Sequence, residues 1–122
     1  MVKLGVLINN KDRPTELALL LQSIRTQTFK DFDVYILDDF SGTPLMSYHF
    51  LAMLITRMNC EGNYVYIDRT EFPHGVSKAR QKIVENAMKR GYEYLMRVDD
   101  DCILEPDYIE RLFKVIDKGY DI

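Results

Sequence analysis

The chain has 122 residues, of which 47% are hydrophobic and 29% are charged, and its formal net charge is −3 at pH 7. This length fits one domain with an apolar core, and the acidic balance argues against a nucleic-acid binder, which usually presents a basic surface. The two cysteines, Cys60 and Cys102, form neither a CxxC pair nor a zinc-ligand spacing with the two histidines. No apolar run approaches the ~18 residues that span a bilayer. We therefore expect free thiols and a protein that is cytoplasmic or peripheral to the membrane.

Strand and helix patterns alternate along the first half of the chain. The short apolar run at residues 2–8 predicts a buried strand. Pro14 then opens a helix in which leucine and isoleucine recur at helical spacing. Residues 32–37 predict a second strand, residues 45–58 a second helix and residues 64–67 a third strand.

The second half continues the alternation. A third helix is expected to begin at Gly75 and to end before Gly91, a typical C-terminal cap. Residues 94–98 predict a fourth strand, and the last helix is expected between Pro106 and Gly119. The order βαβαβαβα predicts an α/β fold with a mostly parallel, Rossmann-like sheet and helices on both faces. Since a fifth strand is expected where the sequence stops, we expect a truncated sheet.

Polar residues follow each predicted strand. They are Asn9 and Asn10, then Asp38 and Asp39, then Asp68, and finally Asp99, Asp100 and Asp101. In parallel α/β sheets ligands bind at the carboxyl ends of the strands. We therefore expect a binding site where these side chains converge.

The three adjacent aspartates are the first candidate for chemistry. Three neighbouring carboxylates repel one another unless a cation compensates them, and Mg²⁺ and Mn²⁺ prefer oxygen ligands. If the strand continues, Asp99 and Asp101 point to the same side and can share a metal, while Asp100 points elsewhere or contacts a nucleotide. The alternative is a solvated acidic turn that caps the following helix.

Two further clusters suit a nucleotide. A carboxylate at Asp38 or Asp39 can accept hydrogen bonds from a base N–H or a ribose hydroxyl, or it can simply stabilise a turn. Residues 75–80 read GVSKAR and open a helix, whose N-terminus attracts anions, with Lys78 and Arg80 adding positive charge. An exposed basic helix face is the alternative reading.

The loop after the first strand is a weaker candidate. It contains Asn10, Lys11, Asp12 and Arg13. All are polar, but Asp12 also suits a cap of the helix that follows. His74 is a lone histidine in a loop, which favours a surface or hydrogen-bonding role.

Five short segments, in this order, resemble the glycosyltransferases of family 2. The first strand and loop at residues 6–17 are similar to the start of these enzymes, and SIRTQTF at residues 23–29 is similar to their S-x-x-x-Q-T-F/Y segment. VYILDDFS at residues 34–41 resembles V-V-D-D-G-S, and GVSKAR resembles G-V-S-x-A-R. MRVDDD at residues 96–101, followed by PDY at 106–108, resembles the D-x-D segment. The resemblance covers essentially the whole chain.

The resemblance implies a GT-A fold in which residues 1–122 are the donor-binding part and the acceptor-binding part is absent. It implies transfer of a sugar from a nucleotide sugar, by default a UDP-sugar, to a hydroxyl of a glycan, lipid or protein acceptor. Mn²⁺ or Mg²⁺ would assist at Asp99 and Asp101. The family inverts the anomeric configuration, and its catalytic base lies beyond the segment that ends at residue 122. The chain is thus expected to supply no catalytic residue.

By the same resemblance, Asp39 would bind the base with Asp38 beside it, and Arg80 and Lys78 would approach the diphosphate. The full set of expected nucleotide-binding residues is Asn10, Lys11, Arg13, Asp38, Asp39, Lys78, Arg80 and Asp100. Two positions depart from the family pattern. Lys11 stands near a position that is often aromatic in the family, and Phe40 replaces the usual glycine, which makes Phe40 a candidate for part of the stacking.

Other functions share parts of this pattern. A sugar nucleotidyltransferase would carry a glycine-rich basic loop after the first strand, and residues 9–13 contain no glycine. A receiver domain would carry its acidic pair after the first strand, where Asn9 and Asn10 stand instead. A noncatalytic nucleotide-binding module remains an alternative. A sheet that ends on an open edge strand also predicts self-association, such as a homodimer.

Overall fold

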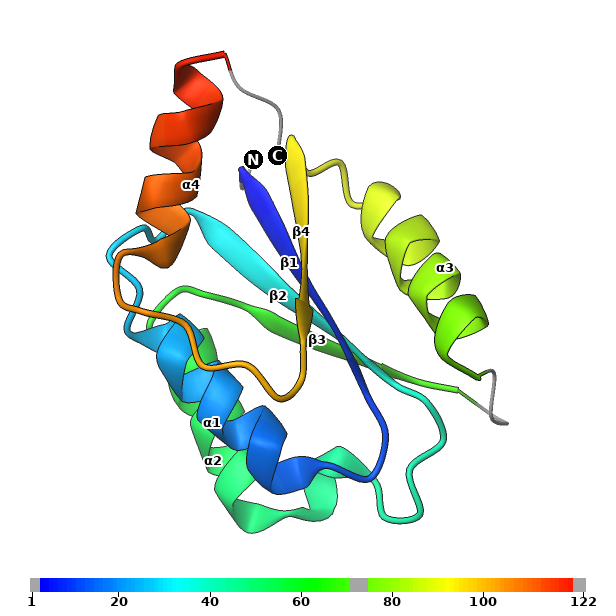
Figure 1. Ribbon diagram of the computed structural model, residues 1–122. Helices are drawn as coiled ribbons and strands as arrows, with labels where there is room; N and C mark the ends of the chain where they lie inside the picture. Colours follow the sequence, from blue (N-terminus) through cyan, green and yellow to red (C-terminus); the bar gives the residue numbers. More distant parts are fainter. Residues whose placement is uncertain (1–2, 71–74, 120–122) are drawn as a thin grey trace.

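The computed structural model describes residues 3–70 and 75–119, with the backbone alone at residues 75–77 and 79–80 (Figure 1). Strands and helices alternate as the sequence predicts. The elements are β1 (Leu4–Asn10), α1 (Pro14–Arg25), β2 (Phe32–Asp38), the 3-10 turn η1 (Leu45–Ser47), α2 (His49–Cys60), β3 (Val65–Arg69), α3 (Gly75–Met88), β4 (Tyr94–Asp99) and α4 (Tyr108–Asp117).

The four strands form one sheet in the order β3-β2-β1-β4, and every neighbouring pair is parallel. The register brings the ends of the strands level. Asn10 pairs with Asp38, Asn9 with Asp99, and Asp38 with Arg69. All four carboxyl ends therefore meet at one edge, which confirms the predicted location of the polar clusters.

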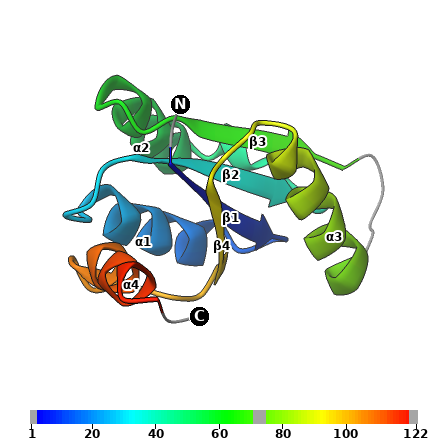
Figure 2. The same ribbon diagram turned by 90° about the horizontal axis from the view of Figure 1, so that it is seen from above.

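Helices cover both faces of the sheet (Figures 1 and 2). Helix α3 lies alone on one face, where Ile83 and Ala87 pack against Leu7 of β1. The main core lies on the other face, where α1, α2 and α4 pack against side chains such as Val6 and Ile8, both fully buried. Each such burial stabilises the fold by roughly 1.5–3 kcal/mol, so the strands are held rigidly beneath the carboxyl edge.

The first residues of two helices differ from the sequence-based expectation. The helix predicted over residues 45–58 begins at His49, because Tyr48 is extended (φ −80°, ψ 117°) and separates α2 from the short turn η1. The last helix begins at Tyr108, after a turn in which the N–H of Tyr108 donates to the carbonyl of Glu105. Gly91 and Gly119 have φ of 79° and 86° after α3 and α4, as expected of C-terminal caps. Within the described ranges, no helix has the length and apolarity needed to cross a membrane.

Candidate functional site at the carboxyl edge

The loop after β1 is tied to the turn after β2. Asp12 adopts φ 56°, its N–H donates to the hydroxyl of Ser41 at 2.9 Å, and its carboxylate accepts from the N–H of Gly42 at 2.7 Å. The expectation that Asp12 caps α1 is wrong, because Arg13 occupies the cap position and makes no capping hydrogen bond through its side chain. Asp12 instead fixes the two loops relative to each other.

Asn10 connects the end of β1 to the acidic turn after β4. Its buried amide nitrogen donates to the carbonyl of Arg13 and to a carboxylate oxygen of Asp100, both at 3.0 Å. Its buried Oδ1 has no hydrogen-bond partner among residues 3–70 and 75–119. Arg13 lies 3.5 Å from Asp100 and 3.9 Å from Asp101. Three of the predicted nucleotide-binding residues, Asn10, Arg13 and Asp100, thus form one contact network.

The carboxylates of the acidic turn are not equivalent. The side chain of Asp100 is 14% exposed, whereas that of Asp101 is 60% exposed. Burial raises the pKa of Asp100 above its usual value, and the nearby charges of Asp101 and Glu16 raise it further, against the lowering effect of Arg13. Asp100 is therefore turned into the protein, and Asp101 faces solvent.

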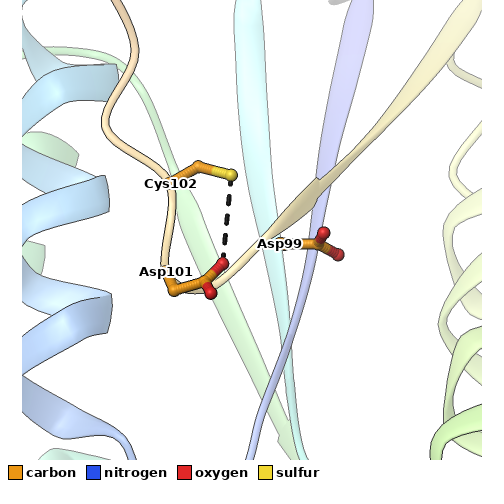
Figure 3. Close-up of side chains that lie close together, drawn as sticks. All are labelled: Asp99, Asp101 and Cys102. Carbon is orange, nitrogen blue, oxygen red and sulfur yellow. Dashed lines mark hydrogen bonds between the residues drawn. The ribbon is translucent and has the colours of Figure 1, made fainter.

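Asp99 and Asp101 come together with Cys102 (Figure 3). One ligand atom from each of these side chains lies within 4.8 Å of the other two. Strand alternation does not cause this convergence, since β4 ends at Asp99 and the chain turns there, with the N–H of Cys102 donating to the carbonyl of Asp99 at 3.2 Å. The two exposed carboxylates suit a hard divalent cation such as Mn²⁺ or Mg²⁺, whereas the thiol of Cys102 is a softer ligand than such a cation prefers.

Helix α1 anchors the segment that follows the acidic turn. The hydroxyl of Ser23 accepts from the N–H of Leu104 at 3.0 Å. The fully buried amide of Gln27 donates to the carbonyl of Glu105 at 2.6 Å and accepts from the N–H of Ile109 at 3.1 Å. The serine and glutamine of the SIRTQTF segment therefore hold the chain in place just after the carboxylates.

The end of β2 holds two buried aspartates with different partners. Asp38 is 1% exposed and lies 3.3 Å from the guanidinium of Arg69, and it also accepts from the N–H of Ser41 at 3.0 Å. Asp39 accepts from the hydroxyl of Thr70 at 3.2 Å, and its N–H donates to the carbonyl of Asn10. Asp38 is thus engaged within the protein, while Asp39 stands between the ends of β1 and β3.

Arg69 and Thr70 were not among the predicted site residues. The apolar pattern ends at Ile67, whereas β3 continues to Arg69 and brings these two side chains to the carboxyl edge. A cation two residues after a short apolar run is the sequence signal that would have found Arg69.

Other predicted residues stand apart from this network. Lys11 is exposed, and Lys78 is exposed in the first turn of α3. The side chain of Arg80 and the whole of His74 lie outside the described residues. Asp68 interacts with Tyr35 and accepts from Asn86 of α3, so its carboxylate belongs to the face that α3 covers.

A hollow of about 790 Å³ lies beside the acidic turn, between β4 and α4. Asp99 and Cys102 stand on its wall, and its other lining residues include Leu104, Tyr108 and Leu112. Strand β4 is an edge of the described sheet on this side. The site is therefore open toward the hollow.

The structure is a doubly wound α/β fold whose polar side chains gather at the carboxyl ends of parallel strands, which is where such sheets bind their ligands. The chain matches the family model described as Glycosyl transferase family 2 over residues 6–122, and it belongs to that family. It is 28% identical to an uncharacterized glycosyltransferase of Haemophilus influenzae over 98% of this chain and 36% of the relative. The chain thus spans about a third of the length of this relative.

Solved structures share the fold. A crystal structure of S. aureus TarS residues 1–349 in complex with UDP-GlcNAc superposes with a TM-score of 0.76 at 19% identity, over 95% of this chain and 31% of that one. The mannosyltransferase PcManGT from Pyrobaculum calidifontis, in complex with GDP-Man and Mn²⁺, gives a TM-score of 0.61 at 13% identity. The match covers 81% of this chain and 27% of PcManGT. These similarities confirm the GT-A type of α/β fold expected from the sequence.

Proposed function

We propose that residues 1–122 form the donor-binding part of an inverting, metal-assisted glycosyltransferase that transfers a sugar from a UDP-sugar to an acceptor hydroxyl. The observation that carries this proposal is the contact network of Asn10, Arg13 and Asp100. It joins the loop after β1 to the acidic turn in which Asp99 and Asp101 converge. Family membership and the fold shared with nucleotide-sugar complexes support it.

In this proposal, different loops at the carboxyl edge bind different parts of the donor. The buried carboxylate of Asp39 accepts a hydrogen bond from the base or ribose, and Thr70 holds that carboxylate in place. Asp38 supports it by fixing the turn. The N-terminus of α3, with Lys78 and Arg80, and the exposed loop residue Lys11 provide positive charge toward the diphosphate.

Asp99 and Asp101 are the proposed ligands of Mn²⁺ or Mg²⁺. A cation bound there would neutralise the negative charge on the departing nucleoside diphosphate. Asn10 and Arg13 hold the turn through Asp100, and Ser23 and Gln27 of α1 hold the segment behind it. These contacts keep the carboxylates in place as the donor arrives, so that little reorganisation is needed.

Inversion requires a base that deprotonates the acceptor hydroxyl. We propose that the rest of the protein supplies this base and most of the acceptor site, since the relatives are about three times as long as this chain. A noncatalytic nucleotide-binding module is the alternative for the chain alone, and family membership favours sugar transfer over nucleotide-sugar synthesis. We also propose that the edge strand β4 supports a homodimer.

Calorimetry tests the donor site directly. We expect UDP and UDP-GlcNAc to bind this chain more tightly with Mn²⁺ than with EDTA, and Asp101→Ala to abolish the difference. Asp31→Ala is the matched control, because it removes an equal charge from an exposed residue just before β2, at the opposite edge of the sheet. Binding that is equal with Mn²⁺ and EDTA would contradict the metal role, and no binding of either nucleotide would contradict the donor site.

A further inference from the structure

Phe40 has an unusual backbone conformation for a bulky residue. Its φ is 59°, in the left-handed region that a large side chain rarely adopts. Its side chain nevertheless stays 41% exposed, so burial of the ring does not explain the conformation. Backbone strain of this kind persists where the surroundings enforce it, and it is concentrated at binding and catalytic sites.

Buried interactions hold Phe40 in this conformation. The N–H groups of Phe40 and Ser41 donate to the carbonyl and to the carboxylate of Asp38, at 2.9 Å and 3.0 Å. Arg69 donates to the carbonyl of Ser41 at 2.7 Å, and its guanidinium carbon lies 5.5 Å from the centre of the Phe40 ring. The ring is thus presented on a rigid turn with a cation close to it.

In the chain, Phe40 directly follows a hydrogen-bond acceptor at the same edge of the sheet. Asp39, the next residue toward β2, is a buried carboxylate held by Thr70 and by the backbone of Asn10. An exposed aromatic residue that follows a fixed acceptor in the chain suits a flat heterocycle that carries an N–H group. Stacking holds the plane of such a ring, and the carboxylate reads its edge.

We propose that Phe40 stacks on the nucleobase of the bound nucleoside diphosphate and that the Asp38–Arg69 pair keeps its ring in place. This inference rests on the proposed function, because it assigns a role within the same donor site. It explains why the turn after β2 carries a strained aromatic residue next to Asp39.

The test compares ligands with and without a base. In Phe40→Asn the ring is lost, but asparagine tolerates a positive φ, so the turn is preserved. With Mn²⁺ present, we expect the affinity for UDP to fall about 5- to 150-fold, as for the loss of one base–aromatic stack. The affinity for inorganic pyrophosphate and the thermal midpoint should not fall.

Two further variants make the result specific. Phe40→Tyr keeps an aromatic ring and should restore UDP binding. Tyr64→Asn removes another aromatic side chain, 53% exposed just before β3 at the opposite edge of the sheet, and should change nothing. Equal UDP affinity in wild type and Phe40→Asn would overturn the inference and leave the proposed donor site standing. A loss of pyrophosphate affinity in Phe40→Asn as large as the loss of UDP affinity would also overturn the inference. If the wild type fails to bind UDP, the proposed function and this inference both fall.

Discussion

Replacing Arg69 with methionine removes the guanidinium that faces Asp38, while keeping a side chain of similar length. The change leaves a carboxylate that is 1% exposed without its cation, and it removes the 2.7 Å hydrogen bond to the carbonyl of Ser41. Breaking a buried ion pair costs about 3–5 kcal/mol. The side chain of Arg69 is 35% exposed and Ser41 still donates to Asp38, so water and this bond offset part of the cost. We expect a loss of about 2–4 kcal/mol.

Urea unfolding followed by circular dichroism measures this loss. With an m-value of about 1–3 kcal/mol per molar urea, the midpoint should fall by about 0.7–4 M. Arg57→Met is the control, since Arg57 is 67% exposed and lies 3.8 Å from Glu61 on the surface of α2, and it should cost less than about 0.5 kcal/mol. The double variant with Asp38→Asn should lose less than the sum of the two single variants. A loss with Arg69→Met no larger than that of the control would refute the reasoning.

Three further predictions concern stability and assembly. Gly5→Ala should lower the free energy of unfolding by about 1–2 kcal/mol in the same assay, because a Cβ there would lie 2.7 Å from the ring of Tyr92; an unchanged midpoint would contradict this packing. Asp100→Asn should raise the thermal midpoint at pH 7. Because the pKa of Asp100 is raised in the fold, its charged form destabilises the protein. The gain in thermal midpoint should therefore shrink as pH falls through that pKa and vanish below about 3.8, the ordinary value of the pKa. A gain that grows as the pH falls would contradict this reasoning. Light scattering should show a dimer that Leu95→Lys on β4 converts to a monomer, whereas a wild-type monomer at high concentration would contradict pairing through this edge.

Hydrophobic periodicity predicted the order of elements, because each strand is a short apolar run and every helix except the one expected at residues 45–58 has a clear apolar face. It placed Asn10 and Asp38 at one edge, since parallel strands share a direction and the register follows from it. The break before α2 was not predictable in this way. Tyr48 is apolar enough to continue the helical pattern, but its extended backbone ends the turn η1.

The side-chain partners of the site were harder to predict than its position. Asp68 follows an apolar run just as Asp38 does, yet it turns toward Tyr35 and α3, because alternate residues of a strand face opposite sides of the sheet. The sequence did not predict a role for Arg69, because Arg69 contacts Asp38, which lies 31 residues away in the chain. Spacing along the chain gives no access to such a pairing until the strand register is known. The roles of the predicted metal and nucleotide ligands stay predictions.

The most direct test of the account is to locate the cation on the chain. Substoichiometric Mn²⁺ broadens the amide signals of nearby residues in a ¹⁵N-labelled sample, and UDP is added to complete the site. The account predicts that the signals of residues 99–102 and 10–13 broaden first, while those of Asp31 and Tyr64 at the opposite edge stay sharp. Broadening that begins at the opposite edge, or that is uniform along the chain, would contradict a metal-assisted donor site at the carboxyl ends of the strands.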